Sequence, residues 1–441
     1  MQQTAEQTCD LLVTADILLT QDGERRIIED AAVAIKDGRI NVLGTRSELA
    51  HMLAKEHLSL RRSLLMPGLV NAHTHVSMTL FRGLADDLPL MEWLTEHIFP
   101  REKHLTAEVV QLGALLGCAE MIRTGTTAFQ DMYLIENAVA EAVNHSGLRC
   151  RMGEGIFAFP SPAYASIPEA YALVREQAAC YKNHPRIRVA VMPHSVYTTT
   201  PEIMIACRDL ARELGLPLHL HLAETAVEVQ TCLDMHGKGP VEYCRELDLL
   251  SPYTTIAHGV VLTGEELDIL ASTGTCVAHN PRSNMKLASG VAPVPDMLAR
   301  GMLPGLGTDG ASSNNSLNMF AEMSACALLH KVHRLEATAC PAQTVLDMAT
   351  LGSAAALHWP ELGRIEPGAP ADLIALNLDS PNLQPLYSPV SHLVYAASGH
   401  ELHMCMVDGK VLYKDGAYFS LDYPVLLSET QKLKKWVLDR K

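Results

Sequence analysis

The chain has 441 residues, of which 48% are hydrophobic and 19% are charged, a globular composition with enough apolar material for a large core. Its net charge is −15, from 35 Lys and Arg against 50 Asp and Glu. Because nucleic acids and anionic membranes bind proteins through positive charge, we expect neither as a partner.

Targeting and membrane-spanning patterns are absent from the sequence. The amino terminus, MQQTAEQTCDLLV, lacks a basic region followed by an apolar one, and polar residues interrupt every apolar stretch before 18 residues. The 11 cysteines are scattered and form no CxxC pair, so we expect reduced thiols in a cytoplasmic protein. The zinc-binding pattern HxE…PCxxC, which marks one class of base-modifying enzymes, is also missing.

Both ends of the chain predict short β-hairpins. Near the start, two apolar runs flank Asp37-Gly38 in AAVAIKDGRINVLG, and near the finish ADLIALNL precedes HMCMVDGKVLYKDGAYF with two more Asp-Gly pairs. Neither segment is long enough to form a stable β core alone. We therefore expect one small β-sandwich domain built from residues 1–66 and 364–441, with residues 67–363 inserted as a second domain.

Between the two ends, strand-like apolar runs alternate with helical patterns such as ENAVAEAVNHSG and PEIMIACRDLARELG. The eight runs are SLLMPGLVNAHTH, TTAFQDMY, LRCRMGEGIF, IRVAVMPHSVY, LPLHLHLAET, TTIAHGVV, TCVAHNP and MLPGLGTDG. Eight such units predict an α/β protein with a (β/α)8 TIM-like barrel, and a doubly wound open sheet is the alternative.

Histidine or aspartate residues close six of these runs. In run order they are His73 and His75, His194, His219 and His221, His258, His279, and Asp309. Because the carboxyl ends of barrel strands meet at one mouth, we expect these side chains to lie close together. Residues i and i+2 of a strand share a face, so HTH directs both of its histidines to the same side.

The donor types at these strand ends predict a metal site. His73, His75, His221 and Asp309 offer three imidazoles and one carboxylate, which zinc binds, and a catalytic zinc site keeps one position open for water. HxH alone is a weak signal, and the other strand ends give it weight.

Some features have a plainer explanation. GLGTDG fits the dinucleotide pattern GxGxxG, but it follows seven β/α units and no strand with a ribose-binding acid follows it, so we attribute its glycines to close backbone packing at the pocket. His219 is expected one layer below His221 as a packed core histidine. His279 could contact substrate or order its loop, and Trp93 could belong to the core or to a pocket wall.

Several motifs together resemble the amidohydrolase superfamily. They are PGLVNAHTH, HLHLAET, IAHGV, VAHNPRSNMKL and GLGTDGASSNNSLNMF. The resemblance extends over nearly the whole chain, through GRIEPGAPADLIAL to MVDGKVLYKDG. It is strongest to the 5′-methylthioadenosine/S-adenosylhomocysteine deaminase branch, with triazine chlorohydrolases and guanine deaminases nearby.

The resemblance implies one metal ion, Zn²⁺ or alternatively Fe²⁺, held by His73, His75, His221 and Asp309. His194 supports a single ion, because binuclear relatives place a bridging modified lysine at that strand end.

Further roles follow from the resemblance. Glu224 corresponds to a proton shuttle between the attacking water and the ring nitrogen, His258 would orient the attacking oxygen, and Asp309 would pass the second proton to the departing ammonia. Glu102 is expected to accept hydrogen bonds from ribose hydroxyls, and His194 is expected near the purine or sugar.

The implied activity is zinc-dependent hydrolysis of adenine nucleosides to inosine analogues and ammonia. Relatives that recognise homocysteine carry an arginine late in strand three, where this chain has Glu154, and another in the following loop, which here has none. Since a carboxylate cannot replace a guanidinium, methylthioadenosine and adenosine are favoured over S-adenosylhomocysteine.

Other functions remain open on the sequence. An amidohydrolase acting on guanine, a pterin or an s-triazine is the alternative enzyme, although chloride departs from a triazine without the proton that Glu224 would deliver. A non-enzymatic scaffold would have no use for the intact donor set. As an enzyme of this branch, the chain is expected to form a homo-oligomer, a dimer or a tetramer.

Overall fold

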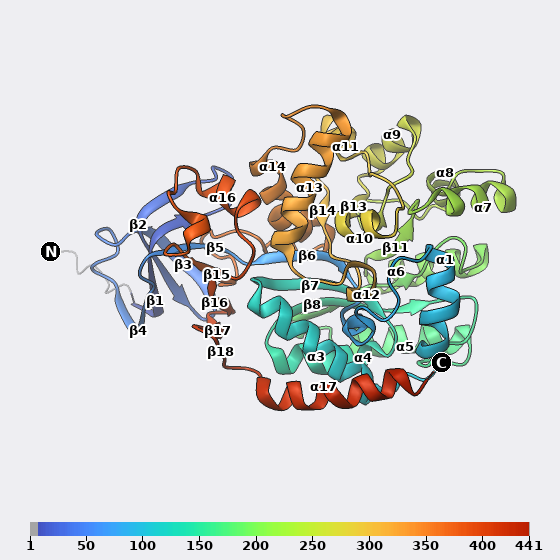
Figure 1. Ribbon diagram of the computed structural model, residues 1–441, viewed down its shortest axis with the longest axis horizontal. Coiled ribbons are helices and arrows are strands. Elements are labelled where there is room, and N and C mark those ends of the chain that lie inside the picture. Colours follow the sequence, from blue (N-terminus) through green and yellow to red (C-terminus); the bar gives the residue numbers. More distant parts are fainter. Residues whose placement is uncertain (1–7, 441) are drawn as a thin grey trace.

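The two ends of the chain share one β-sheet in the computed structural model, which describes residues 8–440. Residues 1–7, part of the stretch judged to lack a signal peptide, lie outside the described residues, as does residue 441. The sheet has the order β18-β17-β16-β15-β5-β1-β2-β3, and β4 pairs with β1 (Figure 1). Its strands are β1 (Thr8–Leu19), β2 (Ile27–Lys36), β3 (Arg39–Thr45), β4 (Leu53–Ser59), β5 (Ser63–Pro67), β15 (Leu373–Asn377), β16 (Leu402–Val407), β17 (Lys410–Lys414) and β18 (Ala417–Tyr418).

Asp-Gly turns connect three neighbouring strand pairs of this terminal sheet. Lys36 pairs with Arg39 across Asp37-Gly38, and both turn residues have positive φ, 51° and 74°. The same geometry recurs at Asp408-Gly409 and Asp415-Gly416. Two consecutive positive φ values define the turn whose twist matches a β-hairpin. The three predicted hairpin turns are therefore confirmed.

The middle of the chain forms two parallel sheets. Their orders are β10-β8-β7-β6, with β9 also on β8, and β11-β12-β13-β14. The strands are β6 (Leu69–Thr74), β7 (Thr126–Tyr133), β8 (Arg149–Ile156), β9 (Ile187–Val189), β10 (Met192–Pro193), β11 (Leu218–Leu222), β12 (Thr254–His258), β13 (Cys276–His279) and β14 (Gly305–Leu306). Bridges from Val191 to Leu218 and from Ser195 to His221 join the sheets at one side. At the other side Asp309 N donates to His73 O at 3.0 Å.

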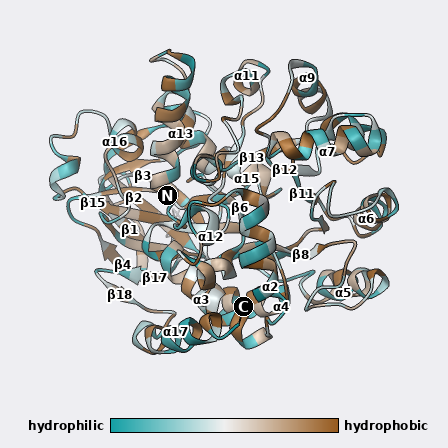
Figure 2. Cartoon of the chain, turned by 45° about the vertical axis from the view of Figure 1, so that its right-hand side comes forward, coloured by the Kyte–Doolittle hydropathy of each residue, from teal (hydrophilic) through white to brown (hydrophobic). Residues whose placement is uncertain are grey.

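Helices follow the parallel strands and cover them (Figure 1). The longer ones are α3 (Ala107–Arg123), α4 (Glu136–Ser146), α5 (Ile167–Cys180), α6 (Pro201–Leu214), α7 (Ala226–His236), α8 (Pro240–Glu246), α9 (Gly264–Thr273), α13 (Met319–Arg334), α16 (Pro389–Tyr395) and α17 (Tyr423–Leu438). The shorter ones are η1 (Val76–Phe81), α1 (Leu90–Glu92), η2 (Trp93–Ile98), α2 (Phe99–Glu102), α10 (Pro281–Lys286), α11 (Val294–Ala299), α12 (Ala311–Asn314), α14 (Ala342–Asp347), η3 (Met348–Gly352), α15 (Ser353–Ala356) and η4 (Pro381–Leu383). In Figure 2 the helices are part hydrophilic and part hydrophobic, as expected for helices that cover a sheet and face water.

One predicted strand is two strands in the structure. SLLMPGLVNAHTH splits at Gly68 into β5, which pairs with β15 in the terminal sheet, and β6, which pairs with β7. A Cβ at Gly68 would lie 2.0 Å from Thr127 Oγ1, so only glycine fits where the chain passes from one sheet to the other. An apolar run has no signal for a change of sheet, which is why the break was not predicted.

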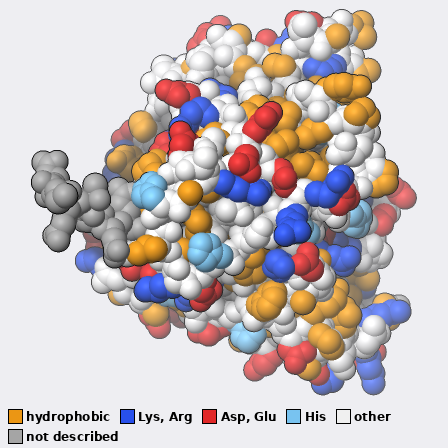
Figure 3. Space-filling model, turned by 90° about the vertical axis from the view of Figure 1, so that its left-hand side faces the viewer, with side chains coloured by type: hydrophobic (Ala, Val, Ile, Leu, Met, Phe, Trp, Pro, Cys, Tyr) orange, Lys and Arg blue, Asp and Glu red, His pale blue; other side chains and the backbone are white. Residues whose placement is uncertain are grey.

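The outer surface carries mixed charge. Figure 3 shows acidic and basic side chains interspersed on the face that bears the terminal sheet. Within residues 8–440, no single helix is long and apolar enough to cross a bilayer, although the sharply bent pair Trp93–Glu102 and Ala107–Arg123 reaches the required length and composition.

Candidate active site

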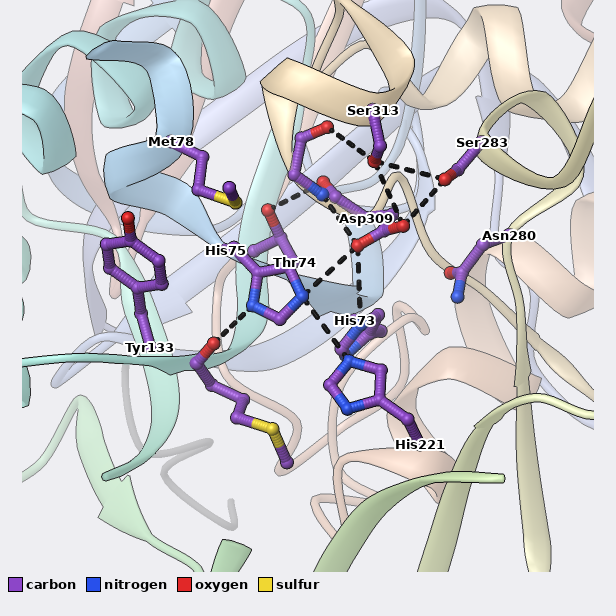
Figure 4. A network of polar contacts seen from close by, with 12 residues as sticks. His73, Thr74, His75, Met78, Tyr133, His221, Asn280, Ser283, Asp309 and Ser313 are labelled. Atoms are coloured by element: carbon purple, nitrogen blue, oxygen red, sulfur yellow. Dashed lines mark hydrogen bonds and ion pairs between the residues drawn. The ribbon is translucent and has the colours of Figure 1, made fainter. Parts of the chain in front are cut away.

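The polar strand ends of the two parallel sheets meet at one place. His75 Nε2 lies 3.3 Å from His221 Nε2 and 3.2 Å from Asp309 Oδ1, and His73 Nε2 lies 3.6 Å from the same carboxylate oxygen (Figure 4). His73 Nε2 is buried and has no hydrogen-bond partner. Four donor atoms, from β6 and the residue after it, from β11 and from the loop after β14, therefore converge.

The other nitrogen of each imidazole is held by the protein. His75 Nδ1 bonds Met132 O, and His221 Nδ1 lies 2.9 Å from His194 O. Because a carbonyl only accepts, both rings carry a proton on Nδ1 and direct Nε2 toward the other donor atoms. His219 is buried, as expected from the sequence. Its Nε2 atom lies 2.9 Å from His73 Nδ1, so it also orients the His73 ring.

The electrostatics reflect this crowding. Although burial opposes it, the two histidines hold the pKa of Asp309 well below its usual range, and Asp309 in turn raises the pKa of His75 to about 9 despite burial. Burial lowers the pKa of His73 to about 4. The three imidazoles and one carboxylate match the donor set of a catalytic zinc site, and one of the imidazole nitrogens, His73 Nε2, is buried without a hydrogen-bond partner. The residues present therefore fit such an ion.

The backbone is strained at two of the strand ends. His258 and Asp309 have φ values of 78° and 59°, in the left-handed region that residues with a side chain rarely adopt. Ser283 and Ser313 donate to Asp309 Oδ2 at 2.6 and 3.0 Å and hold its carboxylate in place. Such strain persists only where surrounding contacts maintain it, and it concentrates at functional sites.

Glu224 and His258 lie beside the converging donors. Glu224 Oε2 is 3.9 Å from His258 Nε2, and burial together with the charge of Asp309 raises the pKa of Glu224 to about 8. Asn284 Nδ2 lies 3.0 Å from His258 Nδ1 and donates to it, which places the ring proton on Nε2, toward the pocket. Glu228 accepts the backbone N–H groups of Ala223 and Glu224 and fixes the loop.

A mostly apolar pocket opens from these groups. Glu102 enters it from α2, accepts a 2.8 Å hydrogen bond from Tyr133, and has its pKa raised to about 7 by burial. His194 packs against Phe157 with ring centroids 4.6 Å apart. The remaining apolar wall is formed by Met78, Leu90, Trp93, Leu94, Ile98, Phe99, Leu134 and Leu287.

No lysine or arginine is among the described residues that line the pocket. Glu154 does not line it either, because its carboxylate accepts the N–H groups of Ile135 and Glu136 at 2.9 Å. Trp93 is buried in the hydrophobic core and also lines the pocket, so both sequence-based alternatives describe it. His279 is also not among the described residues that line the pocket. Its Nε2 atom is hydrogen-bonded to Nε2 of His330.

Comparison with known proteins identifies the family. The model of the amidohydrolase family matches residues 64–412. The chain belongs to this family. It is 59% identical over 434 residues to a 5-methylthioadenosine/S-adenosylhomocysteine deaminase of Nitratidesulfovibrio vulgaris, covering 98% of each protein.

Two further relatives place this amidohydrolase more closely. It is 45% identical over 409 residues to a 5'-deoxyadenosine deaminase of Methanothermobacter thermautotrophicus, covering 92% of this chain and 93% of that protein. The solved structure of an adenosine deaminase from Xanthomonas campestris with bound zinc superposes with a TM-score of 0.96 at 35% identity, covering 98% and 99% of the two chains. The family resemblance predicted from the motifs is confirmed.

Some site residues of this amidohydrolase were not predicted. The sequence offered the motifs that contain Ser283, Asn284 and Ser313 but no signal for their partners, which lie 26, 26 and 4 positions away. Tyr133 likewise ended a predicted strand without any indication that it would bond Glu102.

Proposed function

We propose that the protein is a zinc-dependent hydrolase that converts adenine nucleosides and water into inosine analogues and ammonia. The observation that carries this proposal is the placement of Glu224 beside the converging donors, in a pocket whose other wall presents Glu102. The first group can move a proton at the purine ring, and the second can accept hydrogen bonds from a ribose. The names of the similar deaminases support the same reaction.

One zinc ion, or Fe²⁺ as the alternative, would be held by His73, His75, His221 and Asp309. The clustered nitrogen atoms of the three histidines, the contacts of Asp309 with His73 and His75, and the absence of a hydrogen-bond partner at His73 Nε2 support this assignment. A bound zinc ion lowers the pKa of water to about 7, which makes a nucleophile available at neutral pH.

The chain's own residues then handle two protons. Glu224 takes one from the attacking water and gives it to the ring nitrogen beside the attacked carbon. His258, whose proton lies on Nε2, donates a hydrogen bond to the attacking oxygen. Asp309 accepts the second proton and passes it to the amino group, which leaves as ammonia. The pKa of Glu224, which burial raises to about 8, suits its part in this transfer.

The ribose would be bound through Glu102, with His194 beside the purine or sugar. Tyr133 holds one carboxylate oxygen of Glu102 at 2.8 Å, which leaves the other directed to the substrate hydroxyls. Tyr133 is in this sense a positioning residue.

Methylthioadenosine and adenosine are favoured over S-adenosylhomocysteine as substrates. The amino acid end of S-adenosylhomocysteine carries a carboxylate, and the described pocket lining offers no cation to pair with it. The apolar wall of Leu90, Trp93 and Leu94 suits a methylthio group. A higher kcat/KM for S-adenosylhomocysteine than for both smaller nucleosides would overturn this preference.

We also propose the finer architecture. The bridges at Val191–Leu218 and Ser195–His221, with the Asp309–His73 bond, support one closed (β/α)8 barrel within residues 67–363. The terminal sheet supports a separate β domain formed by residues 1–66 and 364–441.

The remaining proposals concern the protein's setting. All eleven cysteines lie within the described residues and are free, which suits the cytoplasm. A homo-oligomer is supported by an apolar strip along α13, where Leu328 and Val332 are 54% and 67% exposed. Sedimentation analysis would test it.

A substrate panel tests the reaction. Zinc-loaded enzyme is assayed with adenosine, methylthioadenosine, S-adenosylhomocysteine, guanine, a pterin and an s-triazine. Loss of adenine absorbance with ammonia release is expected for the nucleosides. Turnover confined to guanine, the pterin or the triazine would favour the alternative function.

A further inference from the structure

A second group of metal-ligating side chains lies between β13 and α13, apart from the active-site pocket. His279 ends β13, and Cys326 and His330 lie one turn apart on α13. Their ligand atoms lie within 4.8 Å of one another, and all three residues are buried. The described residues that line the pocket include none of them, and the proposed reaction uses none of them.

The two imidazoles of this group have no other described partner. His279 Nε2 and His330 Nε2 are 3.2 Å apart, and both Nδ1 atoms are buried without a hydrogen bond. Buried polar groups are normally satisfied, so a pair bonded only to each other requires an explanation such as a bound ion. Two nitrogen ligands of a tetrahedral zinc ion lie about 3.3 Å apart, which matches the observed separation.

A second cysteine lies next to this group of three. The sulfur of Cys340, just before α14, lies beside the Cys326 thiol. Lys331 Nζ donates to the carbonyl groups of Ala337 and Ala339 at 2.9 and 2.6 Å, which brings its positive charge to the same place. A positive charge beside a cysteine favours its thiolate, which is the form that binds metals.

We propose that His279, Cys326, His330 and Cys340 form a second zinc site that joins β13, α13 and the start of α14. Two nitrogen and two sulfur donors suit a closed, tetrahedral structural site, in contrast to the nitrogen and oxygen donors beside Glu224. The site has no place for substrate, so its role is to stabilise the fold.

Zinc content and X-ray absorption of the full-length protein, purified under reducing conditions and loaded with Zn²⁺, test this proposal. About two zinc ions per chain and a Zn–S shell at about 2.3 Å are expected. The active-site donors include no sulfur, so a Zn–S shell separates the second site from the first. One zinc ion per chain without a Zn–S shell, or a Cys326–Cys340 disulfide in that protein, would overturn the proposal.

The double variant Cys326→Ala/Cys340→Ala assigns the ligands. It is expected to lose the Zn–S shell and one zinc ion per chain, to unfold at a lower temperature, and to keep its kcat for methylthioadenosine within about twofold. Cys207→Ala, which removes an equally buried cysteine on α6, is the matched control and should keep both ions. A Zn–S shell that persists in the double variant would contradict the assignment, and the measurement on the unaltered protein stands even if the variant does not fold.

Discussion

Two regions of the molecule differ in how their buried charged groups are paired. The mouth is formed by the ends of the parallel strands, and the joint lies between the parallel sheets and the terminal sheet. At the mouth, His73 Nε2 has no hydrogen-bond partner and the backbone of His258 and Asp309 is strained. At the joint, Arg149 of β8 bonds Asp372 Oδ2 at 2.6 Å and also bonds Asp408. Buried polar groups without a hydrogen-bond partner can bind a ligand, whereas fully paired charged groups hold secondary-structure elements together. Changes at the mouth should therefore affect rate, and changes at the joint should affect stability.

The largest expected effect is at Glu224. Glu224→Gln removes the proton shuttle while preserving shape, so kcat should fall by about a thousandfold or more. Zinc content and the melting temperature should stay near those of the unaltered enzyme, because Glu224 is not among the proposed ligands. A kcat within tenfold of the original, with zinc bound, would show that another group carries the proton.

Arg149→Met should produce the converse result. The change leaves the buried Asp372 carboxylate unpaired, which should cost about 3–5 kcal/mol of unfolding free energy in a denaturant titration, with kcat at low temperature unchanged. The double variant Arg149→Met/Asp372→Leu should recover part of that loss. If Arg149→Met lowered kcat at full folding, the division between mouth and joint would fail.

The pH dependence of substrate binding tests the role of Glu102 at the mouth. Because its pKa is raised to about 7, its carboxylate form is gained as pH rises through 7, and KM for methylthioadenosine should fall over that interval. Glu102→Gln should raise KM about tenfold and remove this pH dependence. A 2′,3′-dideoxy analogue is the matched control, since its KM should not respond to the substitution.

The smallest expected effect is at Ser313. Ser313→Ala removes one of two hydroxyl groups on Asp309 Oδ2 and leaves Ser283 in place. A decrease in kcat of about three- to tenfold is expected, with zinc content unchanged. Loss of zinc in this variant would mean that the serine supports binding of the ion instead of proton transfer.

The sequence predicted the mouth better than its supporting contacts. Strand ends of parallel sheets meet by topology, so His73, His221 and Asp309 could be brought together from alternation alone. The Asp-Gly hairpins were predictable for a similar reason, because positive φ at two successive residues is a local property.

Contacts between distant side chains were not predictable in this way. The bond of His219 to His73 spans 146 positions, and that of Asn284 to His258 spans 26. Such pairs depend on the packing of side chains after the sheets have formed, which periodicity does not encode. The change of sheet at Gly68 escaped prediction because the apolar run is equally suited to both sheets.

The pairing of β5 with β15 has a consequence for synthesis on the ribosome. β5 ends at Pro67, and its partner β15 begins at Leu373. One edge of β5 therefore stays unpaired until most of the chain has been translated. The hairpin of β2 and β3 can form at once and pair with β1, but the open edge of β5, on the other side of β1, can pair with other strands. We expect nascent chains stalled before residue 373 to depend on chaperones that shield this edge, and full-length chains to be released from them.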